Sequence, residues 1–154
     1  MKPIIKQHTL IILSTFIFST LFFDACKVIL VPKYDDKVAE QIESVTKSID
    51  RLYLTMLETT TEADGGRVYS KFADQYIAID IELISLLNKN KAREKNEETI
   101  KICEKAISMF DKYKNEHKKE NTINDADIKL NLEYLRGILY PLMISEDAKK
   151  MNNK

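Results

Sequence analysis

Residues 38–56 read VAEQIESVTKSIDRLYLTM, and their apolar side chains recur at alternating intervals of four and three residues. This spacing puts them on one stripe of an α-helix, the pattern of a helix that packs against others. The stripe consists of Val38, Ile42, Val45, Ile49, Leu52 and Met56. We predict a helix over about residues 35–58, because Asp35 and Asp36 can accept hydrogen bonds from the unpaired N–H groups at its start. Three adjacent threonines and then Gly65-Gly66 are expected to end it.

The same spacing returns in a second segment, over about residues 68–89. Its main apolar line consists of Tyr69, Phe72, Tyr76, Ile79, Leu83 and Leu86. A second set widens the apolar face and consists of Ile77, Ile81, Ile84 and Leu87. A face this wide predicts that the helix contacts two neighbours, as in a bundle.

A third helix is expected over about residues 97–117, and a fourth begins after Asn124. The third carries two apolar lines, Ile100, Cys103, Ile107 and Phe110 beside Ile102, Ala106, Met109 and Tyr113, and the fourth carries Ile128, Leu132, Leu135, Leu139 and Leu142. Asn124 and Asp127 have the spacing of a capping box. Residues 112–119 are highly charged, so we expect the last turns of the third helix to project into water. Pro141 lacks a backbone N–H, which predicts a kink or an early end near Tyr140.

Four amphipathic helices of similar length with short polar connections predict an all-α fold. The simplest packing is an antiparallel up-and-down four-helix bundle over residues 35–148, followed by a polar tail over residues 149–154. Two stacked helical hairpins of the solenoid kind are the alternative, although the two halves show no clear internal repeat.

The first 26 residues have the layout of a secretory signal. Lys2 and Lys6 give a basic start, residues 10–23 are uncharged and apolar, and Phe23-Asp24-Ala25-Cys26 closes the segment. Fourteen residues rise only about 21 Å as a helix, which is short of a hydrocarbon core of roughly 30 Å. Ordinary signal peptidase requires a small residue where Phe23 stands, so that cleavage route is not favoured.

Ala25 and Cys26 resemble the end of the lipobox of bacterial lipoproteins, while Phe23 and Asp24 replace its aliphatic and small residues. The resemblance implies that Cys26 is acylated and becomes the first residue of the mature chain. Residues 1–25 would then be a signal helix and residues 26–34 a tether. The domain would be lipid-anchored in the bacterial cell envelope, in the periplasm or outside the cell. The alternative is an uncleaved anchor, because residues 28–31 could extend the apolar run.

Composition limits the classes of partner. The chain has 154 residues, 24 basic and 24 acidic side chains, and a hydrophobic content of 44%. This composition fits one globular domain, and it offers no basic surplus to neutralise a phosphate backbone, so nucleic acid is not an expected partner. Cys103 has a helical core spacing and is expected to be a buried apolar residue. A Cys26–Cys103 disulfide is the alternative if Cys26 is unmodified in an oxidising compartment.

The sequence contains no recognisable catalytic, metal or cofactor motif. Its two histidines, His8 and His117, cannot supply the Glu-x-x-His pairs of a di-iron bundle. The Cys-x-x-Cys-His motif of a covalently bound haem is also missing. His117 stands among lysines, and we expect it to be a solvated surface residue. We therefore expect no catalytic residue, no cofactor and no enzymatic activity.

Two groups of side chains are candidates for a binding role. The first could line an acidic strip, although a solvated face accounts for it more simply. It consists of Asp74, Asp80, Glu82, Glu97 and Glu98. The second could rim a groove, or be core residues whose hydroxyls reach the surface. It consists of Tyr69, Tyr76, Tyr113, Tyr134 and Tyr140.

The expected function is that of a membrane-tethered interaction or accessory module whose partner is another envelope protein. We place its contact region at residues 113–124, which include Lys114, Lys118 and Lys119. The alternative is a carrier that binds a lipid or a small apolar ligand within the bundle. A continuous apolar surface patch would favour the interaction module, and a large internal void would favour the carrier.

Overall fold

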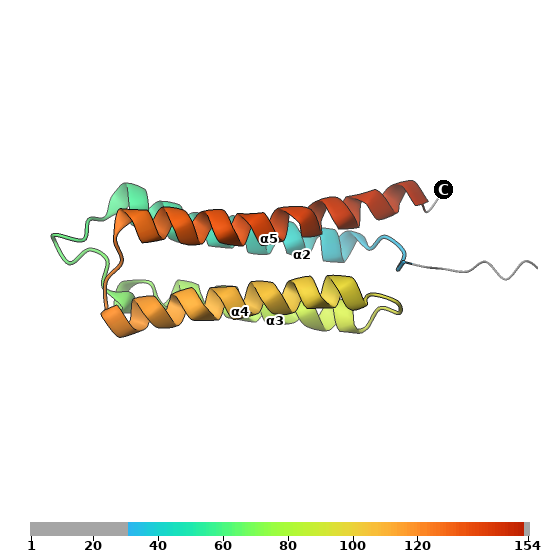
Figure 1. Ribbon diagram of the computed structural model, residues 1–154, viewed down its shortest axis with the longest axis horizontal. Coiled ribbons are helices and arrows are strands. Elements are labelled where there is room, and N and C mark those ends of the chain that lie inside the picture. The colour runs from blue at the N-terminus through green and yellow to red at the C-terminus, as the bar shows by residue number, and fades with distance from the viewer. Residues whose placement is uncertain (1–30, 153–154) are drawn as a thin grey trace, which may run out of the picture.

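A computed structural model describes residues 31–152 and shows an all-helical domain (Figure 1). Its elements are α2 (Asp36–Thr59), the short 3-10 helix η1 (Tyr69–Lys71), α3 (Ala73–Lys91), α4 (Glu97–Glu120) and α5 (Asp125–Asn152). No strand occurs within residues 31–152, so the prediction of an all-α fold is confirmed there. The predicted signal helix and Cys26 lie outside the described residues.

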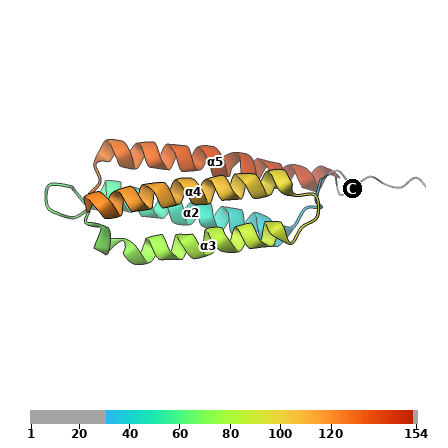
Figure 2. The same cartoon turned by 60° about the horizontal axis from the view of Figure 1, so that its bottom comes forward.

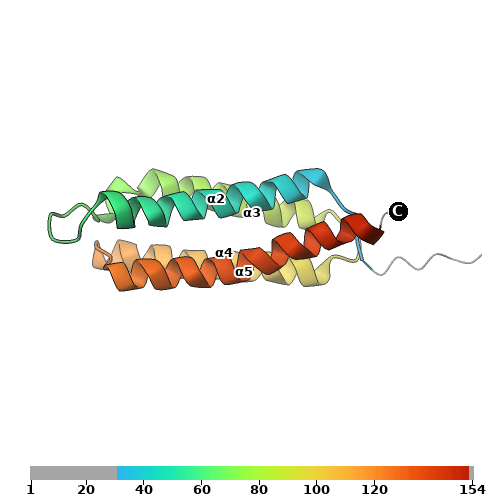
Figure 3. The same ribbon diagram turned by 90° about the horizontal axis from the view of Figure 1, so that it is seen from above.

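The four long helices pack against each other in a ring, consistent with a four-helix bundle. α2 contacts α3 and α5, and α4 contacts the same two helices. Successive helices run in opposite directions (Figures 2 and 3). The start of α2, the α3–α4 turn and the end of α5 therefore share one end of the domain, which we call the entry end. The α2–α3 loop and the α4–α5 turn lie at the other end, which we call the far end.

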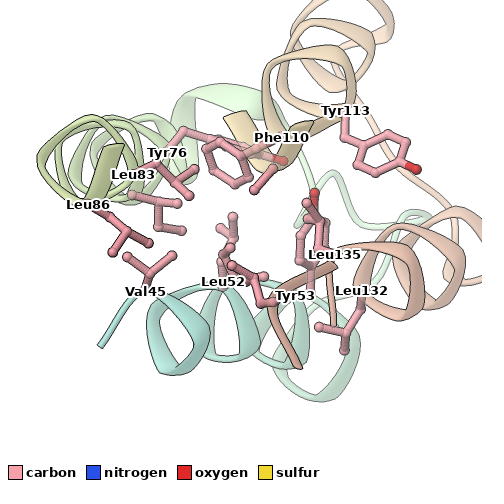
Figure 4. Close-up of a cluster of buried hydrophobic side chains, with 14 of the residues drawn as sticks. Val45, Leu52, Tyr53, Tyr76, Leu83, Leu86, Phe110, Tyr113, Leu132 and Leu135 are labelled. Carbon is pink, nitrogen blue, oxygen red and sulfur yellow. The ribbon is translucent and has the colours of Figure 1, made fainter. Parts of the chain in front are cut away.

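The core consists of the apolar stripes that the sequence predicts. All six residues of the α2 stripe are buried, and Tyr53 joins them between the helices (Figure 4). The other three long helices supply most of the rest of a single cluster, which includes Tyr76, Leu83, Phe110 and Leu135. Burial of such side chains stabilises the fold by about 1.5–3 kcal/mol each relative to exposure. Cys103 is buried and unpaired within the described chain, as predicted for an apolar core position.

Helix starts follow the predicted capping chemistry. The Asp35 carboxylate accepts hydrogen bonds from the backbone N–H groups of Lys37 and Val38, at 2.9 and 3.2 Å. Asn124 and Asp127 pair at the start of α5, and the predicted capping box forms in part, because the second bond comes from the Asn124 side chain rather than from its backbone N–H. The Asp127 N–H donates to Asn124 Oδ1 at 2.9 Å, and the Asn124 amide donates to the Asp127 carboxylate at 2.7 Å. These bonds satisfy backbone donors that a helix start otherwise leaves open.

One prediction about α3 is wrong. Ile77, Ile81 and Ile84 do not widen its buried face but are exposed, Ile81 by 63%. The reason is the position of the neighbours: the core stripe of α3 already faces α2 and α4, so the side that carries these three isoleucines faces no described helix. α3 also begins at Ala73, after the turn η1, rather than near Val68.

α5 continues through Pro141 to Asn152 rather than ending near Tyr140. The proline is exposed, so its ring and its missing donor lie on the outer side of the helix, away from the core. The helix therefore includes part of the stretch expected to form the polar tail.

A buried ion cluster ties α5 to the entry end. Glu146 is 1% exposed and accepts two hydrogen bonds from Arg93, at 2.8 and 3.0 Å, and one from Lys149 at 2.7 Å. It also accepts the backbone N–H of Asp35 at 3.0 Å, and Arg93 donates to the carbonyl of Lys33. Burial alone would raise the pKa of Glu146, but these hydrogen bonds outweigh it and hold that pKa below its ordinary value.

Candidate interaction site between α4 and α5

A depression of about 340 Å³ lies between the last turns of α4 and the first turns of α5, at the far end. We call it the α4–α5 depression. Much of it falls within the contact region predicted from sequence, residues 113–124. Its lining consists of Lys112, Tyr113, Glu116, His117, Glu120, Thr122, Ile123, Asp127, Leu130, Asn131 and Tyr134.

His117 is buried, with 2% of its surface exposed, so the expectation of a solvated side chain is wrong. It continues the line of Phe110 and Tyr113 at intervals of three and four, and α4 packs against its neighbours over this length. His117 Nε2 lies 2.8 Å from the carbonyl oxygen of Arg67, and Nδ1 lies 2.9 Å from the hydroxyl oxygen of Tyr76. The last turns of α4 are thus part of the bundle rather than a projection into water.

These contacts fix the tautomer of the neutral imidazole. A carbonyl oxygen only accepts, so Nε2 carries the proton and donates it to Arg67, while Nδ1 accepts from the Tyr76 hydroxyl. Burial lowers the pKa of His117, although the hydrogen bond to the Arg67 carbonyl acts in the opposite direction. Aromatic rings surround the imidazole, with the centroids of Tyr69, Tyr76 and Phe72 at 5.6, 5.7 and 6.3 Å.

Behind the depression lies a polar group without a hydrogen bond. Tyr53 reaches from α2 into the core beside Phe110 and Leu135 (Figure 4). Its hydroxyl is buried and has no partner of hydrogen-bonding geometry. Burial raises the pKa of Tyr53 well above the ordinary tyrosine value, and the nearby hydroxyls of Tyr76 and Tyr113 act in the same direction, whereas Asn131 acts in the opposite one. Asn131, 6% exposed, belongs to the lining of the depression.

The rim of the depression is aromatic, apolar and acidic. Leu130 and Tyr134 are exposed large side chains on α5, and Tyr113 lies across from them on α4. The charged side chains of the lining are three carboxylates and one ammonium group. The carboxylates belong to Glu116, Glu120 and Asp127, and the ammonium group belongs to Lys112. Lys112 Nζ lies 5.7 Å from the ring centroid of Tyr113 and 3.9 Å from a Glu116 carboxylate oxygen.

Two basic residues of the predicted contact region, Lys114 and Lys118, lie on the other flank of α4, toward α3 and η1. Lys119 instead pairs with Glu120, which lines the depression, at 3.1 Å. Lys114 is largely covered and pairs with Asp80 on α3 and with Asp111, each at 2.6 Å. It is therefore a link between α3 and α4 rather than a solvated charge. Lys118 and Lys119 are exposed, and Lys118 Nζ lies 5.8 Å from the ring centroid of Tyr69. Glu116 and Glu120 thus line the depression beside α5, while Lys114 and Lys118 face α3 and η1.

Arg67 is a structural residue that the sequence analysis missed. Its guanidinium is buried and donates to the carbonyls of Met56, Thr60 and Ile123, at 3.3, 3.0 and 3.3 Å. It also pairs with the Asp125 carboxylate at 2.6 Å. One side chain thus joins the end of α2 to the turn that leads into α5. A lone arginine directly after Gly65-Gly66 is the signal that could have indicated it.

The other sequence candidates are not brought together as one site. Asp80 points to Lys114 on α4, while Glu82 accepts hydrogen bonds from Ser44 and Ser48 on α2, so the acidic strip does not form. Of the five tyrosines, Tyr113 and Tyr134 do line a common depression, whereas Tyr76 is in the core. Tyr140 lines a separate groove between α2 and α5 of about 440 Å³, which includes Gly137 and Met143.

The described residues offer little reactive chemistry. Burial raises the pKa of the Cys103 thiol to about 11, which keeps it protonated at neutral pH and poorly nucleophilic. Within residues 31–152 no group of three or more His, Cys, Asp or Glu side chains is placed to hold a metal ion. None of the helices described there combines the length and the apolar character that crossing a membrane requires.

No protein family, curated protein or solved structure matches this chain.

Proposed function

We propose that this chain is a membrane-tethered lipoprotein of the bacterial envelope that acts as a non-enzymatic interaction module. In this proposal a signal helix over residues 1–25 is removed, Cys26 carries the lipid, and an antiparallel up-and-down bundle presents its far end to another envelope protein. The module uses no cofactor. The basis for the tether is the order of charge, apolar run and small residue before Cys26.

The observation that supports an interaction role is the number of large apolar side chains left at the surface. Ile77, Ile81 and Ile84 form a stripe on α3, and Leu130 and Tyr134 stand at the α4–α5 depression. Clustered exposed apolar side chains are typical of surfaces that bind a partner. By contrast, the bundle interior is filled by one cluster of buried apolar side chains, which gives less support to a carrier with a ligand inside.

The exposed lysines at the end of α4 allow a test of the contact region. Lys118→Glu with Lys119→Glu should reduce recovery of a membrane partner that co-purifies with the tagged full chain in mild detergent. Lys114 is left unchanged, because reversing its charge would place it against Asp80 and Asp111. The matched control is Lys47→Glu with Lys37→Glu, two exposed lysines of α2.

Thermal stability should change little in both double variants, since exposed charges contribute roughly 0–1 kcal/mol. Full recovery of the partner with the α4 variant would show that this flank is not the contact. If no partner appears with the unaltered chain under any mild extraction, a carrier of small apolar ligands becomes the better proposal.

A further inference from the structure

We propose that the outer face of α3 binds the same face of a second copy of this chain, with the two α3 helices antiparallel. This inference goes beyond the proposed function, because it concerns self-association rather than contact with another envelope protein. Its basis is the order of apolar and charged side chains along one stripe, which we call the outer α3 stripe. The stripe consists of Asp74, Ile77, Ile81, Ile84, Asn88 and Lys91.

The outer α3 stripe has the spacing of a helix-pairing surface. Its residues follow one another at alternating intervals of three and four over nearly the whole of α3, and every one of them is exposed. The core side of α3 packs against α2 and α4, so the stripe is left at the surface. Its three isoleucines, Ile77, Ile81 and Ile84, are 53, 63 and 51% exposed. Large apolar side chains clustered in this way are typical of a contact surface.

The charges of the stripe favour a second copy as the partner and fix its direction. Asp74 begins the stripe, Lys91 ends it, and the four stripe residues between them are uncharged. In an antiparallel pair, a two-fold axis near the middle of the stripe places Asp74 of each copy beside Lys91 of the other, so an ion pair forms at both ends. In a parallel pair the two Asp74 carboxylates would meet, as would the two Lys91 ammonium groups, and like charges repel.

The register that joins the charged ends also pairs the apolar middle. When Asp74 lies opposite Lys91 of the second copy, Ile81 lies opposite Ile84, and the two-fold axis repeats this contact. Four isoleucines, two from each copy, therefore form the centre of the interface. Small side chains such as the exposed Ala78 stand beside them, which allows the two helices to approach closely.

The charged ends are available for a new contact. Lys91 pairs within the chain with Glu104 on α4 at 3.5 Å, and both side chains are half-exposed. Such an exposed pair is weak, so the Lys91 ammonium can turn to a second carboxylate at low cost. Asp74 lies in the first turn of α3 and is exposed.

The size of the stripe indicates a reversible dimer. From Asp74 to Lys91 it is about 26 Å long at a rise of 1.5 Å per residue. One helix from each copy over this length gives an interface at the low end of the range for specific complexes. We therefore expect a dissociation constant in the micromolar range rather than an obligate dimer.

An antiparallel pair also has a consequence for the proposed tether. The two-fold axis is perpendicular to α3, so the entry ends of the two copies point in opposite directions. Two copies with lipids in one bilayer would pair lying along it, which residues 26–34 allow because they span up to about 30 Å when extended. An unpaired copy would be free to project its far end.

Analytical ultracentrifugation of the full chain in density-matched detergent micelles, over about 1–100 µM, measures the association. The unaltered chain should form a dimer reversibly within this range. Ile81→Glu should weaken the dimer at least about tenfold, because it places two carboxylates in the apolar centre. Ile144→Glu is the matched control, since Ile144 is an exposed isoleucine of α5, and it should dimerise like the unaltered chain. Circular dichroism and thermal unfolding check that both variants are folded.

Charge reversal tests the direction of pairing. Asp74→Lys and Lys91→Asp should each weaken the dimer by about fivefold or more, because each variant brings like charges together at both ends. Combining the two substitutions restores opposite charges, so the dissociation constant should return to within about twofold of that of the unaltered chain. A parallel dimer would behave differently, since like charges already meet there and neither single variant would weaken it.

A chain that stays monomeric up to about 100 µM would overturn the proposal. So would equal weakening by Ile81→Glu and Ile144→Glu, which would place the contact elsewhere, or single charge variants that dimerise like the unaltered chain. Failure of the combined variant to recover would also count against the antiparallel register. The interaction function is judged separately, by recovery of the membrane partner with Lys118→Glu and Lys119→Glu.

Discussion

Single polar side chains hold the far end of the bundle through backbone carbonyls. Arg67 donates to carbonyls from the end of α2 and from the α4–α5 turn, and its own carbonyl accepts from His117. The sequence carries only weak signals of these roles: Arg67 directly follows Gly65-Gly66, and His117 continues the spacing of Phe110 and Tyr113, but an arginine in a polar loop and a histidine among lysines are also ordinary surface patterns. His117 and Arg67 contact each other although they are 50 positions apart in the chain. Local periodicity carries no information on contacts between such distant residues.

Because His117 is buried, we predict that the free energy of unfolding decreases in mild acid. Its pKa in the folded chain is lower than in the unfolded chain, where the ordinary value is about 6.5, so the unfolded state binds the proton first. The contribution is constant above about pH 7.5 and is lost as the pH falls through 6.5 toward the folded pKa, with a slope of at most about 1.4 kcal/mol per pH unit. Urea unfolding of the full chain between pH 7.5 and 5 measures this slope.

His117→Gln provides the comparison, because glutamine can still donate to the Arg67 carbonyl but does not titrate. Its free energy of unfolding should be lower at pH 7.5 and nearly constant down to pH 5. The same slope in both chains would mean that another group is responsible.

Arg67→Met should lower the free energy of unfolding by about 2–3 kcal/mol, because it removes a buried guanidinium that donates to the carbonyls of Thr60 and Ile123 and shares that of Met56 with the Thr60 hydroxyl. The ion pair with Asp125 adds little, since the Asp125 side chain is 61% exposed. Arg51→Met is the matched control: Arg51 is exposed on α2, so a change within about 0.5 kcal/mol is expected. Chemical denaturation of both variants at pH 7.5 compares them. A small effect of Arg67→Met would show that water replaces the guanidinium.

At the scale of the elements, the sequence predicted the positions of the helices well. It was less reliable for the side of each helix that is buried. The 4-3 spacing of α2 was sufficient because α2 has a single apolar stripe. In α3, Ile77, Ile81 and Ile84 repeat with the same period as the core residues, so periodicity alone could not separate the covered side from the exposed one. Of the two outcomes predicted at Pro141, an early end does not occur. The carbonyl of Gly137, which Pro141 cannot hydrogen-bond, belongs to an exposed residue where water can bind it.

Gly137 occupies a solvent-exposed position in the middle of α5. Glycine destabilises a helix at such a position. A Cβ added there would meet no atom within 4 Å, so Gly137→Ala should raise the free energy of unfolding by about 0.5–1 kcal/mol. Gly65→Ala should have the opposite sign, because Gly65 has a φ of +66°, which L side chains rarely adopt. Thermal unfolding of the two variants side by side checks both signs. A gain from Gly65→Ala would mean that the α2–α3 loop adopts another conformation.

At the scale of the whole molecule, the four-helix arrangement could be predicted because helix number, length and loop length leave few ways to bury four stripes. The α4–α5 depression could be predicted only in part. Residues 113–124 were identified from charge, and Tyr134 was named among five tyrosines that could rim a groove, but Asn131 on α5 was not identified. Their convergence with Tyr113 depends on the packing of α4 beside α5 rather than on any local pattern.

The proposed membrane tether can be tested by replacing Cys26. Cys26→Ser should abolish labelling of the full chain by a radioactive or clickable fatty acid and should leave an unprocessed precursor of higher mass, because a serine offers no thiol for acylation. Gel mobility and mass spectrometry of membrane fractions measure both effects. Cys103→Ser serves as the control and should keep lipid labelling, since its thiol is buried. Unchanged processing of Cys26→Ser would favour an uncleaved anchor.

The chain enters at the end of the domain opposite to the α4–α5 depression (Figure 1). α2 has 24 residues, and at a rise of 1.5 Å per residue it spans about 36 Å. A lipid on Cys26 would therefore hold the depression about 36 Å beyond the point where the proposed tether, residues 26–34, joins the bundle. Envelope proteins that expose only short loops above the bilayer would not reach the depression. A folded ectodomain that rises more than about 36 Å from the lipid surface would meet the depression without either protein bending.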